Sequence, residues 1–314
     1  MLVQLEEEYP QDLRVIYRDF PLLTNPGHEK AGLAAQASHA AAIQDKFWEL
    51  HSLLFTEQSY WSSLEMDEFE RWLVAEATNL GMNETQFLED IQSEAIIEKV
   101  EQAFIDGEKT GLPGTPFLLI NGQIYTGPAD YGSLKQIISL ISLGARQFTN
   151  CPPQVIDLSK EYLAFLKFKK GEVVIQFYPQ QAPIAVNNFI FLAQEGWFTG
   201  NTFHRVLPEY FAESGDPSGT GQGNPGYFFK NEIDPSLSFD RPGVVAMKNF
   251  APDTNGSQFF ITYAAVPFYD GKYTIFGQVL SGMEILEELS PRDPQFGDVL
   301  PPGDQLLGVT IEER

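Results

Sequence analysis

The sequence predicts two domains of different class, an α/β domain over residues 1–146 and an all-β domain over residues 161–314, joined by a linker at 147–160. With 314 residues the chain is long enough for two domains of ordinary size. Helical and strand patterns alternate in the first half, whereas the second half has short strands separated by loops rich in Gly and Pro. Between them, GARQFTNCPPQVIDLSK shows no period and carries a pair of prolines, which is typical of a linker.

In the first half, RVIYRDFPLL (14–23) is rich in β-forming residues and predicts a strand. PFLLINGQIYTG (116–127) has an Asn-Gly pair between two apolar runs, which is the strongest short-range signal for a β-hairpin. Segments with apolar residues at helical spacing predict helices at residues 29–55, 67–82, 85–111 and about 130–142.

The second half begins with EYLAFLKFKKGEVVIQFYP (161–179), which predicts a hairpin with its turn at Lys169-Lys170-Gly171. APIAVNNFIFLAQEGW (182–197) predicts one amphipathic helix. The short strands that follow favour a sandwich or a barrel with few helices.

The composition of the chain excludes or disfavours several classes of function. The net charge of −23 and pI of about 4.4 disfavour nucleic-acid partners, because such a surface repels phosphate backbones. No apolar run reaches the roughly 18 residues that a membrane span needs. Cys151 is the single cysteine, which excludes an intrachain disulfide, a CxxC pair and a cysteine-based zinc site. The histidines at 28, 39 and 51 recur 11 and 12 residues apart, whereas a metal site needs much closer ligands, so we expect no metal; we also expect no cofactor.

One charged residue stands out in the second half. In FHRVLPEYFAESGDP (203–217), Arg205 lies among aromatic residues and Glu213 follows eight positions later. Arginine is rarely buried without a partner, so one reading is a structural ion pair on a barrel wall. The segments GVVAMKNFAPDTNGSQFFIT (243–262) and VPFYDGKYTIFGQV (266–279) add aromatic rings and side-chain amides. Together these groups indicate an apolar pocket with a few polar groups.

Three motifs in this order, FHRV…F…GDP, NGSQFFIT and DGKYTIFGQV, resemble the cyclophilin family of peptidyl-prolyl cis-trans isomerases. The similarity runs from about Tyr162 to the C-terminus. It implies a closed eight-stranded β-barrel capped by two helices, with a hydrophobic proline pocket beside the arginine.

The resemblance also implies roles for single residues. Arg205 would be the catalytic donor, while Phe211, Phe260, Phe268 and Tyr269 would hold the proline ring. The remaining substrate-binding positions are the Asn249 backbone and the Gln258 amide at the peptide flanks, and Tyr210, Tyr273, Lys248 and Glu213 around the pocket.

Some positions depart from the family pattern. Glu213 stands where glutamine is usual, and an ionised carboxylate can steady Arg205 but cannot donate a hydrogen bond to substrate. We therefore expect isomerase activity that is reduced by Glu213. His204 is left out of the catalytic set, since rotation about an amide needs no proton transfer.

The first half resembles the DsbA type of thiol oxidoreductase, through YRDFPL (17–22) and GLPGTPFLLINGQIY (111–125). The resemblance implies a thioredoxin fold with a helical insertion and a cis-proline at Pro116. The first strand and the CxxC of that family would lie upstream of Met1, so the domain is incomplete. Either the chain starts at an internal methionine, or the domain is a remnant kept for packing or peptide binding. We expect this half to be the less stable one, or to self-associate through its incomplete sheet.

The leading prediction is thus a prolyl isomerase that assists protein folding and acts on proline-containing unfolded or flexible polypeptides. The alternative is a weakly active or inactive module that binds proline peptides as a holdase or scaffold. A third reading is part of a disulfide oxidoreductase whose CxxC lies upstream. The N-terminus lacks a signal peptide, which predicts a cytoplasmic address as written and an extracytoplasmic one if the true start lies upstream.

Overall fold

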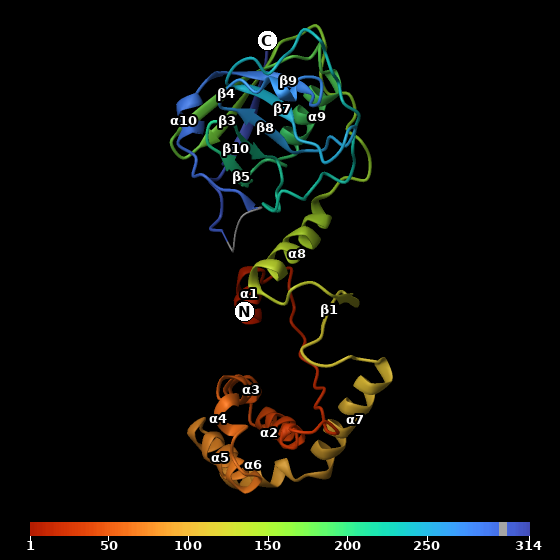
Figure 1. The fold of residues 1–314 in the computed structure, drawn as a ribbon, viewed down its shortest axis with the longest axis vertical. Helices are drawn as coiled ribbons and strands as arrows, with labels where there is room; N and C mark the ends of the chain where they lie inside the picture. The colour runs from red at the N-terminus through yellow and green to blue at the C-terminus, as the bar shows by residue number, and fades with distance from the viewer. Residues whose placement is uncertain (295–299) are drawn as a thin grey trace. The chain divides into compact units, whose positions relative to one another are not determined.

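The computed structural model describes residues 1–294 and 300–314 (Figure 1). Contacts between Cα atoms divide the chain into two compact units, one of Val15–Gly127 and one of Met1–Arg14 together with Pro128–Arg314. Within the described ranges, no helix combines the length and the apolar character needed to cross a lipid bilayer.

The unit Val15–Gly127 is a group of helices with one small hairpin. Its buried core is an apolar cluster that includes Leu50, Phe69, Leu73 and Phe87. The helices are α2 (Ala31–Ile43), α3 (Phe47–Thr56), α4 (Gln58–Trp61), α5 (Met66–Asn79), α6 (Glu84–Ile91) and α7 (Glu94–Thr110).

Two of the predicted helices are interrupted. The prediction of one helix over 29–55 is wrong, because the backbone turns at Asp45, whose φ of 57° is left-handed and cannot continue an α-helix. The prediction over 85–111 is wrong in the same way. Ser93 caps α7 by accepting a hydrogen bond from the backbone N–H of Ile96, and serine favours such caps over helix interiors.

The predicted hairpin is confirmed and the predicted strand at 14–23 is wrong. Strands β1 (Leu118–Ile120) and β2 (Gln123–Tyr125) pair across Asn121 and Gly122, which both have positive φ. Among the described residues of this unit only these two segments form strands, and residues 14–23 adopt no regular secondary structure apart from a turn at the end. The Thr115–Pro116 peptide bond is cis.

In the other unit, α1 (Leu2–Glu8) and α8 (Tyr131–Leu143) lie together, with a 2.7 Å hydrogen bond between the hydroxyls of Tyr9 and Ser139. The short 3-10 helix Gly144–Arg146 follows. Residues 147–160 have no regular secondary structure, yet Ile156 is buried in the main core and Phe148 packs against it.

The rest of this unit is an eight-stranded antiparallel sheet in the order β10-β3-β4-β9-β7-β8-β6-β5. Hydrogen bonds between residues 200–203 and 304–306, including Phe203 N to Asp304 O at 2.9 Å, join the segments that precede the two end strands. The sheet thus curls on itself as the predicted barrel requires. Its strands are β3 (Tyr162–Phe168), β4 (Gly171–Phe177), β5 (Arg205–Leu207), β6 (Phe211–Ser214), β7 (Val244–Met247), β8 (Phe259–Thr262), β9 (Ile275–Ser281) and β10 (Gly308–Glu313).

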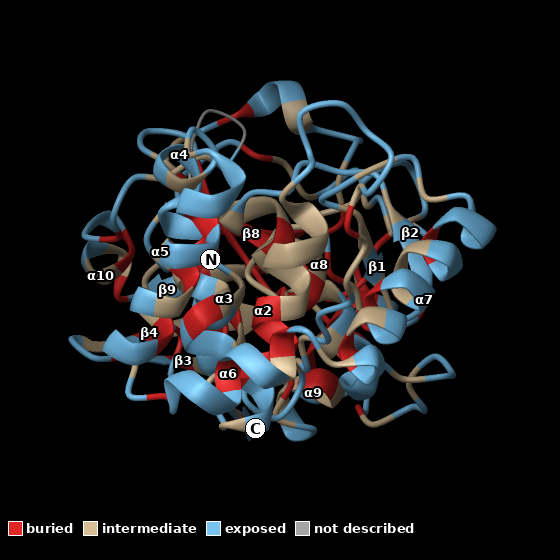
Figure 2. Cartoon of the chain, turned by 90° about the horizontal axis from the view of Figure 1, so that it is seen from below, coloured by how far each residue is buried: buried red, intermediate tan, exposed pale blue. Residues whose placement is uncertain are grey.

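Helices α9 (Pro183–Gln194) and α10 (Met283–Glu287) accompany the sheet. The helix predicted at 182–197 is confirmed, but most of α9 is buried rather than half exposed, because residues 185 to 190 all lie in the interior. Figure 2 shows buried residues concentrated on strands such as β3, β4 and β8, whereas α7 is mostly exposed.

Candidate active site

The register of three strands brings the predicted site residues together. Arg205 on β5 pairs with Glu213 on β6, and Glu213 pairs with Phe260 on β8. Residues directly opposite each other in a sheet project from the same face, and successive residues project from opposite faces. Their neighbours Ala212 and Phe259 accordingly belong to the main core. The candidate site therefore lies on the sheet face opposite that core.

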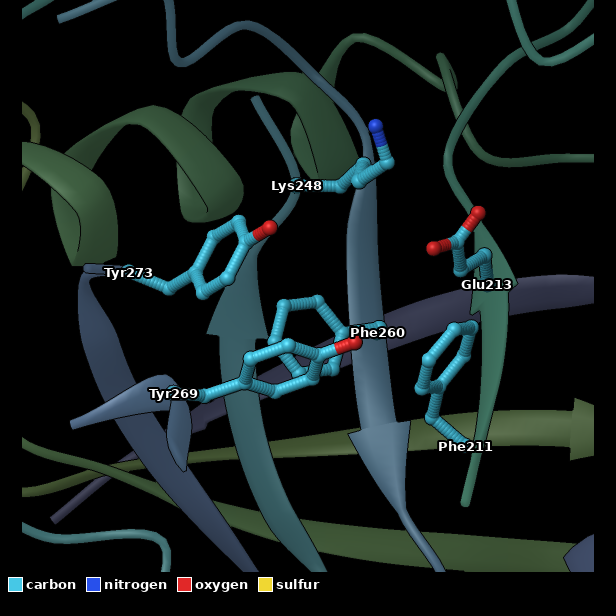
Figure 3. Close-up of a pocket in the computed structure, with 6 residues that line it drawn as sticks. All are labelled: Phe211, Glu213, Lys248, Phe260, Tyr269 and Tyr273. Carbon is cyan, nitrogen blue, oxygen red and sulfur yellow. The ribbon is translucent and has the colours of Figure 1, made fainter. Parts of the chain in front are cut away.

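A hollow of about 170 Å³, which includes open solvent, lies on this face. Figure 3 shows four aromatic rings around it, with the Glu213 carboxylate and the Lys248 ammonium together on one side of the rings. Its six lining residues all belong to the predicted site: Phe211, Glu213, Lys248, Phe260, Tyr269 and Tyr273.

Aromatic contacts fix the wall of the hollow. The Phe260 ring lies 5.8 Å from that of Tyr269 and 5.3 Å from that of Tyr273, both in edge-on geometry. Phe239, which was not among the predicted residues, stacks on Phe260 at 5.8 Å and meets Tyr269 edge-on at 5.9 Å. Burial raises the pKa of Tyr269 and of Tyr273, so both phenols stay neutral. The wall is thus apolar, with two neutral hydroxyl groups.

Arg205 lies beside this hollow, and its side chain is 21% exposed. Asp293 binds it through two hydrogen bonds, from Nε to Oδ1 at 3.2 Å and from Nη2 to Oδ2 at 3.1 Å. The guanidinium carbon also lies 5.3 Å from the centre of the Phe211 ring, within cation–π range. The sequence predicted that Glu213 would steady the arginine, whereas Asp293 had no predicted role.

Glu213 lies near Arg205 but forms no hydrogen bond with it. The shortest distance between them, from Nη1 to Oε1, is 3.7 Å, which is too long for a hydrogen bond. Glu213 is 5% exposed, and this burial raises the pKa of its carboxyl even though Lys248 and Arg205 act to lower it. His204 Nε2 lies 4.0 Å from Glu213, and burial lowers the pKa of this histidine. Its two ring nitrogens are buried and form no hydrogen bond with the described residues.

The polar side chains beside the hollow already form hydrogen bonds within the protein. Gln258 Nε2 donates to the carbonyls of Gly221 and Gly223, at 3.1 and 2.8 Å, whereas its buried Oε1 has no hydrogen-bond partner in the described part of the chain. Lys248 Nζ donates to the carbonyl of Asn249 at 3.1 Å. Lys248 and Gln258 also line a second small hollow next to the first. In this arrangement Gln258 can offer a ligand an acceptor oxygen rather than a donor.

Three of the predicted residues lie apart from this group. Tyr210 and Phe268 are 50% and 54% exposed and do not line the hollow, although the Phe268 ring contacts Tyr269 at 4.6 Å. Pro116 belongs to the other unit. Asp293 could not be found from the sequence, because it lies in the segment SPRDP, which matches none of the three motifs.

Comparisons with known proteins identify the family of the half of the chain that carries this site. Residues 163–302 match the family model for cyclophilin type peptidyl-prolyl cis-trans isomerase/CLD. A peptidyl-prolyl cis-trans isomerase-like 1 of Gibberella zeae is 42% identical over 127 residues, which cover 40% of this chain and 78% of the relative. The chain belongs to the cyclophilin family. The human protein of the same name is 40% identical over 128 residues, covering 40% of this chain and 77% of the relative.

This cyclophilin is a peptidyl-prolyl cis-trans isomerase fused to a second domain, since residues 1–139 match a thioredoxin family model. A crystal structure of a Cryptosporidium parvum cyclophilin, in the presence of the dipeptide Ala-Pro, is also similar. It has 30% identity and a TM-score of 0.44, and the match covers 48% of this chain and 98% of that one.

Proposed function

We propose that Arg205 catalyses the isomerisation by stabilising the twisted prolyl amide at the hollow lined by Phe211, Phe260 and Tyr269. Rotation about an X–Pro bond breaks amide resonance and meets a barrier of about 18–20 kcal/mol. In the twisted state the proline nitrogen regains its lone pair and becomes a better hydrogen-bond acceptor. A guanidinium that donates to this nitrogen binds the twisted state better than either planar isomer.

The position of Arg205 supports this proposal most directly. Its guanidinium is mostly shielded from water and adjoins an aromatic wall, and arginine keeps its charge in such surroundings. The proline ring would lie against the aromatic rings, with the flanking peptide toward Lys248, Asn249 and Gln258. We propose proline-containing unfolded or flexible polypeptides as substrates, which would give the protein a role in folding.

A protease-coupled assay on a prolyl peptide tests the role of Arg205. We expect Arg205→Ala to lower kcat/KM by about 10²–10³-fold, as for the loss of one preorganised donor in other enzymes. Arg205→Lys keeps the charge but not the planar fork and should recover only part of the activity. Full activity of Arg205→Ala would contradict the proposal.

A second candidate function is binding of proline peptides with little turnover. The observation that favours it is the Glu213 carboxylate at the hollow, which repels a substrate carbonyl oxygen when ionised. The isomerase and the binding module differ in their effect on the rate of cis-trans exchange. The binding module would bind the peptide, detected by a change in its NMR signals, without speeding cis-trans exchange above the uncatalysed rate.

For the first domain, we propose self-association through the β1–β2 hairpin. Leu119 and Ile124 of this hairpin are 58% and 63% exposed, and the edge of a small sheet is a template for pairing with a strand of another chain. Sedimentation velocity over a concentration series tests this. A single monomeric species at all concentrations would contradict it.

A further inference from the structure

We propose that Asp293 is a positioning residue for isomerisation, which holds the Arg205 guanidinium in its working orientation. This inference rests on the proposed role of Arg205. Asp293 binds one edge of the guanidinium at two points, with both hydrogen bonds close to 3.1 Å. Paired hydrogen bonds of this kind between Arg and a carboxylate fix the plane of the group as well as its place. The Asp293 side chain is 11% exposed, so water competes little for these bonds.

The fold holds Asp293 next to Arg205 through its neighbour in the sequence. Arg292 forms an antiparallel bridge with Val206, the residue after Arg205, through backbone hydrogen bonds of 2.9 and 2.8 Å. The side chain of Arg292 also donates to the carbonyl of His204, the residue before Arg205, at 3.0 Å. The segment that carries Asp293 is thus bound to the backbone on both sides of the catalytic arginine.

Asp293 uses some of the N–H groups of Arg205, and the others can donate to a substrate. Asp293 accepts from Nε and from Nη2, and no hydrogen bond from Nη1 occurs among residues 1–294 and 300–314. Nη1 is the nitrogen that lies on the Glu213 side, at 3.7 Å, and Glu213 lines the hollow. Asp293 therefore holds the far edge of the guanidinium and leaves Nη1 free to donate toward the hollow.

Two contacts together restrict the guanidinium. Asp293 fixes its edge, and the Phe211 ring covers one face at 5.3 Å. Without Asp293 the long side chain could rotate about its terminal bonds and point Nη1 away from the proline nitrogen. Catalysis by a preorganised donor is sensitive to such misplacement, and an error of 1 Å can cost about 10²-fold in rate.

The test compares Asp293→Ala and Asp293→Asn with the unchanged protein in the protease-coupled assay. We expect Asp293→Ala to lower kcat/KM by about tenfold or more, mostly in kcat, because the pocket that binds the proline ring is kept. Asp293→Asn keeps one acceptor oxygen for Nε and should give an intermediate loss. Near-UV circular dichroism and the melting temperature establish that each variant is folded.

A double-mutant cycle separates positioning from a general structural role. If Asp293 acts through Arg205, Asp293→Ala should cost almost nothing further in the Arg205→Ala background. Asp240→Ala is the matched control, since Asp240 binds Arg241 through the same two-point geometry at an exposed site, at 2.7 and 3.0 Å. The control should keep full activity.

Equal losses from Asp293→Ala in the presence and absence of Arg205 would overturn the inference, as would unchanged kcat in folded Asp293→Ala. Either result would leave the role of Arg205 itself intact, provided that Arg205→Ala is impaired. Full activity of Arg205→Ala would instead remove the proposed function on which this inference rests.

Discussion

At the residue scale, Glu213 distinguishes this site from a purely apolar pocket with an arginine. Its carboxyl is buried and accepts no hydrogen bond from the described residues. The nearest cationic groups are Arg205 at 3.7 Å and His204, when protonated, at 4.0 Å. A neutral glutamine of similar shape could donate to substrate and would not draw charge from Arg205. We expect Glu213→Gln to raise kcat/KM severalfold, where each tenfold corresponds to about 1.4 kcal/mol. An unchanged or lower kcat/KM would refute this.

The same substitution should change stability in a pH-dependent way. Burial raises the pKa of Glu213 above its usual 4.5, so the folded chain holds this proton more tightly than the unfolded chain does. The contribution of Glu213 to stability therefore falls as the pH rises from 4.5 through the raised pKa. Glutamine does not titrate, so the gain from Glu213→Gln should be larger at neutral than at acidic pH. A gain of about 1 kcal/mol would raise the Tm by about 2–4 °C.

Thermal unfolding at several pH values checks this, with Glu172→Gln, an exposed position on β4, as the control. A Tm difference for Glu213→Gln that stays constant with pH, or that grows toward acidic pH, would contradict the expected sign.

The three segments that carry the sequence motifs contain all six residues that line the hollow but do not contain Asp293, which binds Arg205. Phe211, Glu213 and Phe260 were predictable because they lie on strands with a recognisable motif and converge through strand register. Asp293 lies 88 positions from Arg205 in a segment without a motif, and only the bridge between Arg292 and Val206 brings it there. Contacts of this kind depend on tertiary structure and leave no periodic signal in the sequence.

At the element scale, the turns were the most predictable feature of the chain. The Asn121-Gly122 pair and the Lys169-Lys170-Gly171 turn both join hairpin strands as expected, since local backbone preferences decide such turns. The long helices were less predictable, because the apolar spacing continues across the breaks at Asp45 and Ser93. The strand expected at 14–23 failed because β propensity gives no strand without a neighbour.

Residues 147–160 illustrate how the barrel uses a segment without secondary structure. On α9, Asn187 donates to the carbonyl of Pro153 at 2.9 Å and accepts from the backbone N–H of Val155 at 2.7 Å. Asn187 is buried, so Asn187→Ala leaves both backbone groups short of a partner. We expect it to destabilise the barrel by about 1–3 kcal/mol and to speed hydrogen exchange around residue 155.

Asn188→Ala is the matched control on the same helix. The Asn188 side chain donates to the carbonyl of Gly256 and accepts from the hydroxyl of Tyr227. Asn188→Ala should therefore destabilise the barrel without speeding hydrogen exchange around residue 155. Unchanged exchange at residue 155 in Asn187→Ala would show that these bonds do not hold the segment.

At the scale of the whole molecule, the two units differ in the size of their apolar cores and of their sheets. The unit Val15–Gly127 has one apolar cluster and a two-stranded sheet, whereas the other unit has an eight-stranded sheet with clusters on both faces. Small sheets with exposed apolar residues are marginally stable on their own. We therefore expect the unit Val15–Gly127 to unfold first on heating and to be cut first by protease.

Limited proteolysis followed by mass spectrometry measures the order of cleavage. With a little chymotrypsin, the first lasting fragment should begin after Gly127 and retain the C-terminus, because cleavage follows local opening and the barrel opens least. This fragment should keep the prolyl isomerase activity of the whole chain, since every residue that lines the hollow lies in it. Early cuts within β3 to β9, with residues 15–127 still intact, would contradict the expected order of stability.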